Sequence, residues 1–225
     1  MTSAASLAMK KALIFDMDGV LVDSEPFYFK RRMNYFKMRG IEPDSTDIHD
    51  YLGMSNDQVW AALVNDPEKR RQLWQDYQSF QDENPIDYRQ VLNPGVRELL
   101  QYLQNNGYGV ALASAGIPEE INRMVDECQI RPFFNLILSG EKLAANKPAP
   151  DIYLKAIEKL KVSREESLVI EDSYNGITAA KRAGIETWAI DQSDMGVDQS
   201  AADKVVADIP EVQRLSLIHI SEPTR

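Results

Sequence analysis

Short apolar runs rich in β-branched residues recur along the chain and alternate with longer segments of helical periodicity. A brief hydrophobic run bounded by polar residues or glycine is typical of a strand that is buried on both faces of a parallel sheet. The pattern predicts six strands, of which the last lies at an edge. They span residues 11–16, 109–114, 135–139, 167–171, 186–190 and 204–207.

Helices are expected between these strands. In segment 96–105, the apolar residues at positions 96, 99, 100 and 103 fall on one helical face. Segment 174–183 ends before Gly184, and glycine is favoured directly after a helix. Segments 118–128 and 151–160 are also expected to be helical. Strands that alternate with helices predict the α/β class, here a Rossmann-like parallel sheet with helices on both faces.

One stretch of the chain departs from this alternation. Residues 24–93 contain no convincing strand, but their periodicity predicts helices over 26–39, 56–64 and 68–81. An all-helical insert between the first and second strands is a cap, which can act as a lid over a ligand crevice. We therefore expect two domains. They are an α/β core formed by residues 9–23 and 94–214, and a helical cap formed by residues 24–93.

The two ends of the chain are expected to lie outside these domains. Residues 1–8 are mostly small or polar, and Met9 stands before the first predicted strand as a natural start. Residues 215–225 resemble the translated read-through of a sequencing adaptor more than the end of a domain. We expect both ends to be non-native or disordered, and the alternative for residues 215–225 is an ordinary C-terminal strand.

Charge and cysteine content narrow the function classes. With 25 Lys and Arg against 35 Asp and Glu, the net charge of −10 argues against a surface that binds nucleic acid. The single cysteine, Cys128, excludes an intramolecular disulfide, and two histidines disfavour a histidine-rich zinc site. No apolar run near the start is long enough for a membrane span or an export signal. These features favour a cytoplasmic protein with no nucleic-acid or membrane partner.

Candidate chemistry gathers at the ends of the predicted strands. In an open parallel sheet, ligands bind beyond the carboxyl ends of the strands. The residues expected there are Asp16, Asp18, Ser114 followed by Ala115, Lys147, Glu171 and Asp172. Four carboxylates at one locus cannot all stay ionised without a cation, because like charges raise one another's pKa. Oxygen ligands without histidine or cysteine suit Mg²⁺.

A bound Mg²⁺ would neutralise this cluster and allow a phosphate group to approach. Lys147 can then act as a point charge on phosphoryl oxygens, and Ser114 and the backbone N–H groups of Ala115 and Gly116 can donate hydrogen bonds to them. The chemistry that fits is phosphoryl transfer to a carboxylate nucleophile. The expected partner is a small phosphorylated metabolite.

Four segments of the chain resemble, in order and spacing, the motifs of the haloacid dehalogenase superfamily. They are FDMDGVLVDSE at 15–25, Ala-Ser at 113–114, KPAPD at 147–151 and VIEDS at 169–173 with Gly176. The match runs from Met9 to about Pro210. The helical insert is similar to the cap of the β-phosphoglucomutase and phosphoglycolate phosphatase branch.

The resemblance implies a role for each matching residue. Asp16 would attack phosphorus and become an aspartyl phosphate, while Asp18 would protonate the leaving oxygen and later deprotonate the attacking water. Ser114, Ala115 and Lys147 would hold the phosphoryl group. Mg²⁺ would be held by the Asp16 side chain, the Asp18 backbone carbonyl and the pair Glu171 and Asp172.

Departures from the family pattern help to choose among its activities. Dehalogenases resemble this sequence but lack the second aspartate of the first motif, so Asp18 points to phosphate esters. Mutases of this branch carry a histidine where this chain has Tyr28 and a cap arginine where it has Asn56. We therefore expect a Mg²⁺-dependent phosphatase of small phosphate monoesters, with sugar phosphates as the expected class.

Two alternatives stay open from sequence. One is a sugar phosphate mutase of the β-phosphoglucomutase type. The other is a non-catalytic regulatory protein on the same scaffold. The presence of every motif residue argues against this second alternative.

Overall fold

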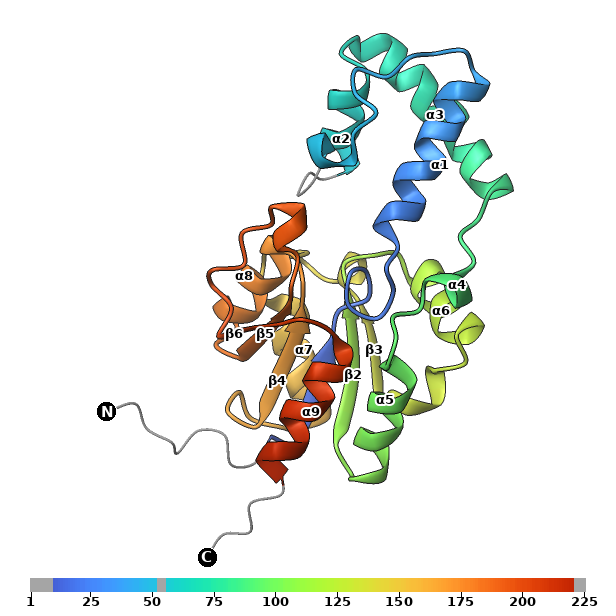
Figure 1. Ribbon diagram of the computed structural model, residues 1–225. Coiled ribbons are helices and arrows are strands. Elements are labelled where there is room, and N and C mark those ends of the chain that lie inside the picture. Colours follow the sequence, from blue (N-terminus) through green and yellow to red (C-terminus); the bar gives the residue numbers. More distant parts are fainter. Residues whose placement is uncertain (1–9, 52–55, 221–225) are drawn as a thin grey trace, which may run out of the picture.

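A computed structural model of the chain describes residues 10–51 and 56–220 (Figure 1). Six parallel strands form one sheet in the order β3-β2-β1-β4-β5-β6. The strands are β1 (Ala12–Phe15), β2 (Gly109–Ser114), β3 (Leu136–Ser139), β4 (Ser167–Glu171), β5 (Glu186–Ile190) and β6 (Lys204–Val206). The predicted α/β class is confirmed. Because β1 pairs with both β2 and β4, the strand order reverses at β1, and a crevice opens at the carboxyl end of such a switch point.

Helices cover both faces of this sheet and form the insert between β1 and β2. The helices are α1 (Glu25–Met38), α2 (Asn56–Leu63), α3 (Pro67–Glu83), α4 (Tyr88–Val91), α5 (Val96–Asn105), α6 (Pro118–Glu127), α7 (Asp151–Leu160), α8 (Tyr174–Arg182) and α9 (Ile209–Ile220). Four short 3₁₀ turns are also described: η1 (Ile48–Tyr51), η2 (Arg131–Phe133), η3 (Gly140–Lys142) and η4 (Ser193–Met195). Among the described residues, no helix combines the length and the apolarity that a membrane crossing requires.

Alternation along the strands divides the core into two layers. Leu13 and Phe15 of β1 point to the face covered by α5, α6 and α9. Ile14 points to the opposite face, which is covered by α7 and α8. Both layers are built from fully buried aliphatic side chains, so the sheet is a rigid base for residues at the ends of its strands.

The helical cap has a core of its own. Helices α1, α2 and α3 enclose a cluster that includes Tyr35, Phe36, Trp60, Leu63 and Tyr77. The rings of Trp60 and Tyr77 lie 5.0 Å apart, and both side chains are buried. Figure 1 shows these three helices beyond the end of the sheet at which the strands finish.

The boundary of the cap differs from the expected one. Ile86 and Tyr88 pack into the α/β core cluster, and α4 contacts α6, so the segment after residue 85 belongs with the core. The four-residue helix α4 is too short to show helical periodicity in the sequence. At this point the two connections of the cap run side by side, because the Asp23 N–H donates to the Val91 carbonyl over 2.8 Å.

The last helix also differs from expectation. Helix α9 was not predicted, and it continues to Ile220, past residue 214 where the core was expected to end. Ile209 and Val212 are buried in the core cluster, and Leu215 packs against that cluster. Pro210 makes the start of this helix hard to recognise in the sequence, because proline usually interrupts helices. Proline is nevertheless tolerated in a first helical turn. Residues 1–9 and 221–225 lie outside the described residues.

Candidate functional site

The side chains predicted to carry chemistry lie at the switch point of the sheet. Asp16 directly follows β1, Glu171 is the last residue of β4, and Asp172 is the next. Lys147 comes from the loop before α7 and reaches the same place. The structure therefore brings together four of the predicted site residues from segments far apart in the chain.

Lys147 links two of these carboxylates. Its ammonium nitrogen lies 2.6 Å from Asp16 Oδ1 and 2.7 Å from Glu171 Oε1. Its side chain is only 5% exposed. Burial alone would lower the pKa of Lys147, but Asp16 and Glu171 hold that pKa well above its ordinary value. The side chain therefore stays a cation inside the protein.

Glu171 is surrounded by hydrogen-bond donors. Its Oε1 accepts from the hydroxyl of Tyr153 over 2.6 Å as well as from Lys147, and its Oε2 accepts from the backbone N–H of Asp172 over 3.0 Å. Both the N–H and the hydroxyl of Ser173 also donate to Oε2. Burial raises the pKa of Glu171, but Lys147 and the other donors outweigh it and the pKa lies below its usual range. Glu171 is therefore a fixed anion.

Asp16 and Asp172 are in the opposite situation. Burial, with the nearby charges of Glu171 and Asp18, raises the pKa of Asp16 to about 7 although Lys147 opposes this. Burial and the charges of Glu171 and Asp16 raise the pKa of Asp172 well above its ordinary value. Within the described part of the chain, no side chain donates a hydrogen bond to the Asp172 carboxylate. Asp16 shares the single ammonium of Lys147 with Glu171, and Asp172 has no paired cation among the described residues.

Two glycines let the backbone approach this cluster closely. Gly19 has a φ of +77°, and a Cβ there would lie 1.9 Å from Asp172 Oδ2. A Cβ on Gly176 would lie 1.7 Å from Glu171 Oε1. The loop after β1 and the first turn of α8 therefore fit around the carboxylates only because these positions have no side chain.

The residues present fit a divalent cation. Ligand oxygens of Asp16, Glu171 and Asp172 all lie within 4.8 Å of one another. Three carboxylates face one ammonium, and the Asp172 carboxylate has no donor within the described residues. Carboxylate oxygens at this density suit a hard cation such as Mg²⁺. The Asp18 side chain is not part of this three-residue group.

Asp18 is held from the cap side of the site. The hydroxyl of Ser24 donates a short hydrogen bond to Asp18 Oδ1. Ser24 occupies the N-cap position of α1, yet its side chain does not cap that helix. Burial raises the pKa of Asp18, and the hydrogen bond from Ser24 opposes this rise. The start of the cap is therefore coupled directly to the second aspartate.

Ser114 and Ala115 lie in a neighbouring loop that is tied to Lys147 indirectly. The Oγ of buried Ser114 accepts from the Gly116 N–H over 3.0 Å. Asn146 donates from Nδ2 to the Ala115 carbonyl over 3.0 Å and accepts at Oδ1 from the Lys147 N–H over 2.8 Å. One asparagine thus fixes the spacing between the loop after β2 and the lysine.

Sequence reasoning missed Ser24, Asn146, Tyr153 and Ser173. Each contacts or orients a predicted site residue through a hydroxyl or an amide. Ser24 and Ser173 lie inside two of the quoted motifs, so their position was a usable signal. Tyr153 gives no such signal, because an aromatic residue in a helix that covers a sheet is ordinarily interpreted as core.

The cap residues singled out from sequence are only partly described. Tyr28 lies on α1 with its hydroxyl 3.4 Å from that of Tyr88. The side chain of Asn56 and residues 53–55 before it lie outside the described part of the structure.

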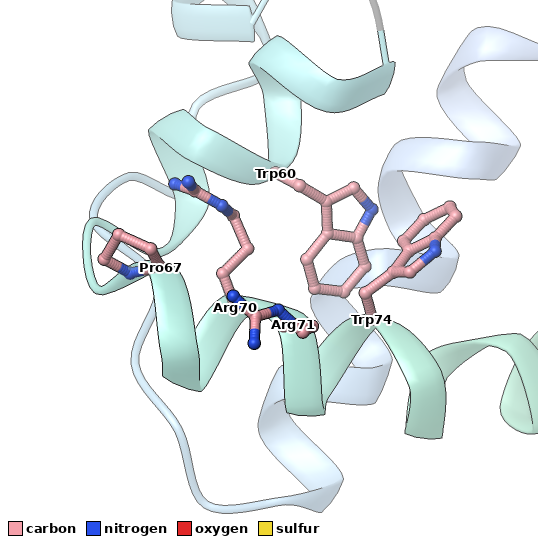
Figure 2. A pocket seen from close by; sticks show the side chains of 5 residues that line it. All are labelled: Trp60, Pro67, Arg70, Arg71 and Trp74. Carbon is pink, nitrogen blue, oxygen red and sulfur yellow. The ribbon is translucent and has the colours of Figure 1, made fainter.

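A cavity of about 360 Å³ lies within the cap and not at the strand ends. Figure 2 shows the residues that line it, which come from α2 and α3: Trp60, Pro67, Arg70, Arg71 and Trp74. No predicted site residue takes part in it. Its arginines have other contacts, since Arg70 donates to the Val64 carbonyl over 3.1 Å and Arg71 pairs with Glu68 over 3.0 Å.

Known proteins resemble this chain over most of its length. A family model described as haloacid dehalogenase-like hydrolase matches residues 13–190. A phosphorylated carbohydrates phosphatase of Thermotoga maritima is 33% identical over 179 residues, which cover 78% of this chain and 82% of that protein. A β-phosphoglucomutase of Bacillus subtilis is 29% identical over 221 residues, which cover 93% of this chain and 94% of that protein.

A solved structure shows the same fold. The haloacid dehalogenase-like family hydrolase of Streptococcus pneumoniae superposes with a TM-score of 0.73 at 22% identity, over 91% of this chain and 97% of that one. The superposition covers cap and core together.

The raised pKa of Asp16 predicts that binding of Mg²⁺ depends on pH. Because that pKa is about 7, Asp16 holds a proton at lower pH when no cation is bound. A cation must displace this proton, so its affinity should fall as pH falls below 7, by about tenfold per pH unit for each proton displaced, and level off at higher pH. Calorimetric titration with Mg²⁺ between about pH 5.5 and pH 8.5 measures this. An affinity that is constant across this range would contradict the role of Asp16 as a ligand, and Asp172→Asn should weaken binding throughout.

Proposed function

This chain belongs to the haloacid dehalogenase-like hydrolases, and on that premise we propose that it is a Mg²⁺-dependent phosphatase of small phosphate monoesters. Sugar phosphates are the proposed substrate class, and the reaction passes through an aspartyl phosphate on Asp16. The observation that carries the proposal is the contact of Lys147 with both Asp16 and Glu171 at the switch point. The similarity to a phosphatase of phosphorylated carbohydrates supports the substrate class.

Asp16 is the proposed nucleophile. One of its carboxylate oxygens attacks phosphorus, the bond between phosphorus and the ester oxygen breaks, and the alcohol leaves. Lys147, fixed against Asp16, offers its positive charge to the phosphoryl oxygens. The Ser114 hydroxyl and the N–H of Ala115 donate hydrogen bonds from the loop after β2.

Asp18 is the proposed acid and base. In the first step its carboxyl group gives a proton to the leaving alkoxide, and the raised pKa keeps that proton available. In the second step its carboxylate takes a proton from water, which attacks phosphorus and releases phosphate and the free Asp16 carboxylate. Ser24 orients Asp18 for both steps.

A metal completes the charge balance of this site. Asp16, Glu171 and Asp172 would hold Mg²⁺ with their side chains, and the Asp18 backbone carbonyl is a further proposed ligand. Bound there, Mg²⁺ supplies the charge that lets an anionic phosphate approach an anionic nucleophile.

A sugar phosphate mutase is the second candidate, and the similarity to a β-phosphoglucomutase over 93% of the chain favours it. The presence of Tyr28 in place of the expected cap histidine argues against a mutase. Burial and the charge of Asp18 raise the pKa of Tyr28 to about 12, so this side chain stays a neutral phenol. A mutase must also hold a second phosphate, which a phosphatase need not do.

Replacing the nucleophile tests the central claim. Asp16→Asn keeps size and polarity but removes the covalent route, so hydrolysis of every phosphate ester should fall by about 10³-fold or more. Release of phosphate from p-nitrophenyl phosphate and from sugar phosphates measures this, with circular dichroism as the check that the variant is folded. Turnover within tenfold of the parent enzyme would reject Asp16 as the nucleophile.

The role of Asp18 predicts a dependence on the leaving group. Asp18→Asn should slow formation of the aspartyl phosphate from sugar phosphates by about 10²-fold or more, and from p-nitrophenyl phosphate far less. A basic alkoxide needs the proton, whereas p-nitrophenolate leaves without it. Single-turnover measurements isolate this first step. Equal losses on both substrates would contradict the assignment.

The mutase alternative predicts a different product. With β-glucose 1-phosphate and a bisphosphate primer, a phosphatase releases inorganic phosphate and a mutase yields glucose 6-phosphate. We expect phosphate release to be the faster process, because the cap lacks the cation expected at position 56. Coupled assays of both products in one reaction decide the matter, and faster isomerisation would replace our proposal with the second candidate.

A further inference from the structure

A carboxylate outside the metal-binding cluster is connected to the first cap helix through two tyrosines. Glu120 stands in the first turn of α6, the helix that follows β2 and the loop of Ser114 and Ala115. Its side chain is 42% exposed. Acidic side chains are favoured at the N-terminal end of a helix, and Glu120 stands there with Glu119.

The contacts of Glu120 leave one of its oxygens available. Oε2 accepts from the hydroxyl of Tyr88 over 2.7 Å and from Arg123 over 2.8 Å. Within the described residues, no side chain donates to Oε1. Arg123 also lies 3.8 Å from Glu127, so this single guanidinium is shared by two carboxylates. The group as a whole therefore carries a net negative charge.

The same contacts place this charge next to Asp18. Tyr88, which donates to Glu120, lies 3.4 Å by hydroxyl oxygens from Tyr28 on the first cap helix. Tyr28 in turn donates from its backbone N–H to the Ser24 carbonyl over 3.1 Å, and the hydroxyl of Ser24 donates to Asp18. Glu120 and Asp18 thus lie on the same side of the site.

The two arginines of the first cap helix are held by contacts within the cap. Arg31 donates to the Tyr77 hydroxyl over 3.2 Å and to the Asn84 carbonyl over 3.1 Å. Arg32 is withdrawn into the cap with 10% of its side chain exposed, and it lies 3.7 Å from Glu25. Arg123 is itself shared by Glu120 and Glu127, so Glu120 Oε1 is a carboxylate oxygen to which no described side chain donates.

We propose that Glu120 makes the site selective for phosphate esters of uncharged, hydroxyl-bearing alcohols and against esters whose alcohol carries a second anionic group close to the phosphate. A hydroxyl group of the alcohol donates to Glu120 Oε1, whereas a carboxylate or second phosphate is repelled there. The inference rests on the proposed phosphatase function and names its substrate class more closely.

A matched pair of substrates tests this selectivity. Glycerol 3-phosphate and 3-phosphoglycerate share a three-carbon chain and differ in whether it ends in a hydroxymethyl group or a carboxylate. The parent enzyme should have the higher kcat/KM for glycerol 3-phosphate. Glu120→Gln keeps size and an acceptor oxygen but removes the charge, so the ratio of the two kcat/KM values should shrink by about fivefold. The change should come mainly from faster hydrolysis of 3-phosphoglycerate.

Glu127→Gln is the matched control. It removes the same charge from the same helix and from the same arginine, but two turns further from the start of α6. It should leave the ratio unchanged. A ratio that Glu120→Gln does not alter, or that Glu127→Gln alters equally, overturns the inference.

A binding measurement separates this inference from the proposed function. In the Asp16→Asn background, calorimetry gives the Kd of each compound without turnover. Glycerol 3-phosphate should bind more tightly than 3-phosphoglycerate, and adding Glu120→Gln should reduce that difference by about fivefold. Absence of hydrolysis by the parent enzyme would reject the phosphatase proposal alone, whereas equal binding of the two compounds before and after Glu120→Gln would reject the selectivity.

Discussion

One buried ammonium holds the site together. Lys147 contacts Asp16 after β1 and Glu171 at the end of β4, so it joins two neighbouring strands to the loop before α7. Carboxylates this deeply buried would be strongly destabilising without a paired cation. The positions of Asn146 and Tyr153 follow from the same constraint, because the first fixes the backbone of Lys147 and the second donates to the carboxylate that Lys147 pairs with.

The pairing is incomplete, and this explains why the three carboxylates of the cluster differ in pKa. Glu171 takes several donors and stays ionised, whereas the pKa values of Asp16 and Asp172 are raised by burial. A site whose carboxylates were all paired with cations would bind a further cation weakly. Here one anion is fixed and the two aspartates bind a proton more readily than usual, so a metal that binds them competes with protons.

The sequence was sufficient for the sheet and for the cluster at its edge. Strand signals were strong because parallel strands are buried on both faces, and Asp16, Lys147, Glu171 and Asp172 follow from where those strands end. Helix α4 was too short for periodicity, and Pro210 masked the start of α9. Tyr153 could not be foreseen, because its ring is ordinary core and only its hydroxyl reaches the site. Residues 86–93, within the expected cap segment, pack against the α/β core, and a position between two strands in the sequence does not reveal that packing.

Under the proposed function, the two domains would divide the recognition of a phosphate ester between them. The cluster around Lys147 belongs wholly to the α/β core. It would contact the phosphoryl group and not the alcohol. The alcohol would instead be recognised where the cap meets the core. Two sets of hydrogen-bonded side chains lie there. Ser24, at the start of the cap, holds Asp18, and Tyr28 on the next turn meets Tyr88, which donates to Glu120. A movement of α1 would therefore change the orientation of Asp18 and the surroundings of Glu120 together. If Asp18 is the proposed acid, proton transfer and selection of the alcohol would depend on the same position of the cap, and reaction would be favoured when a fitting alcohol lies between the two domains.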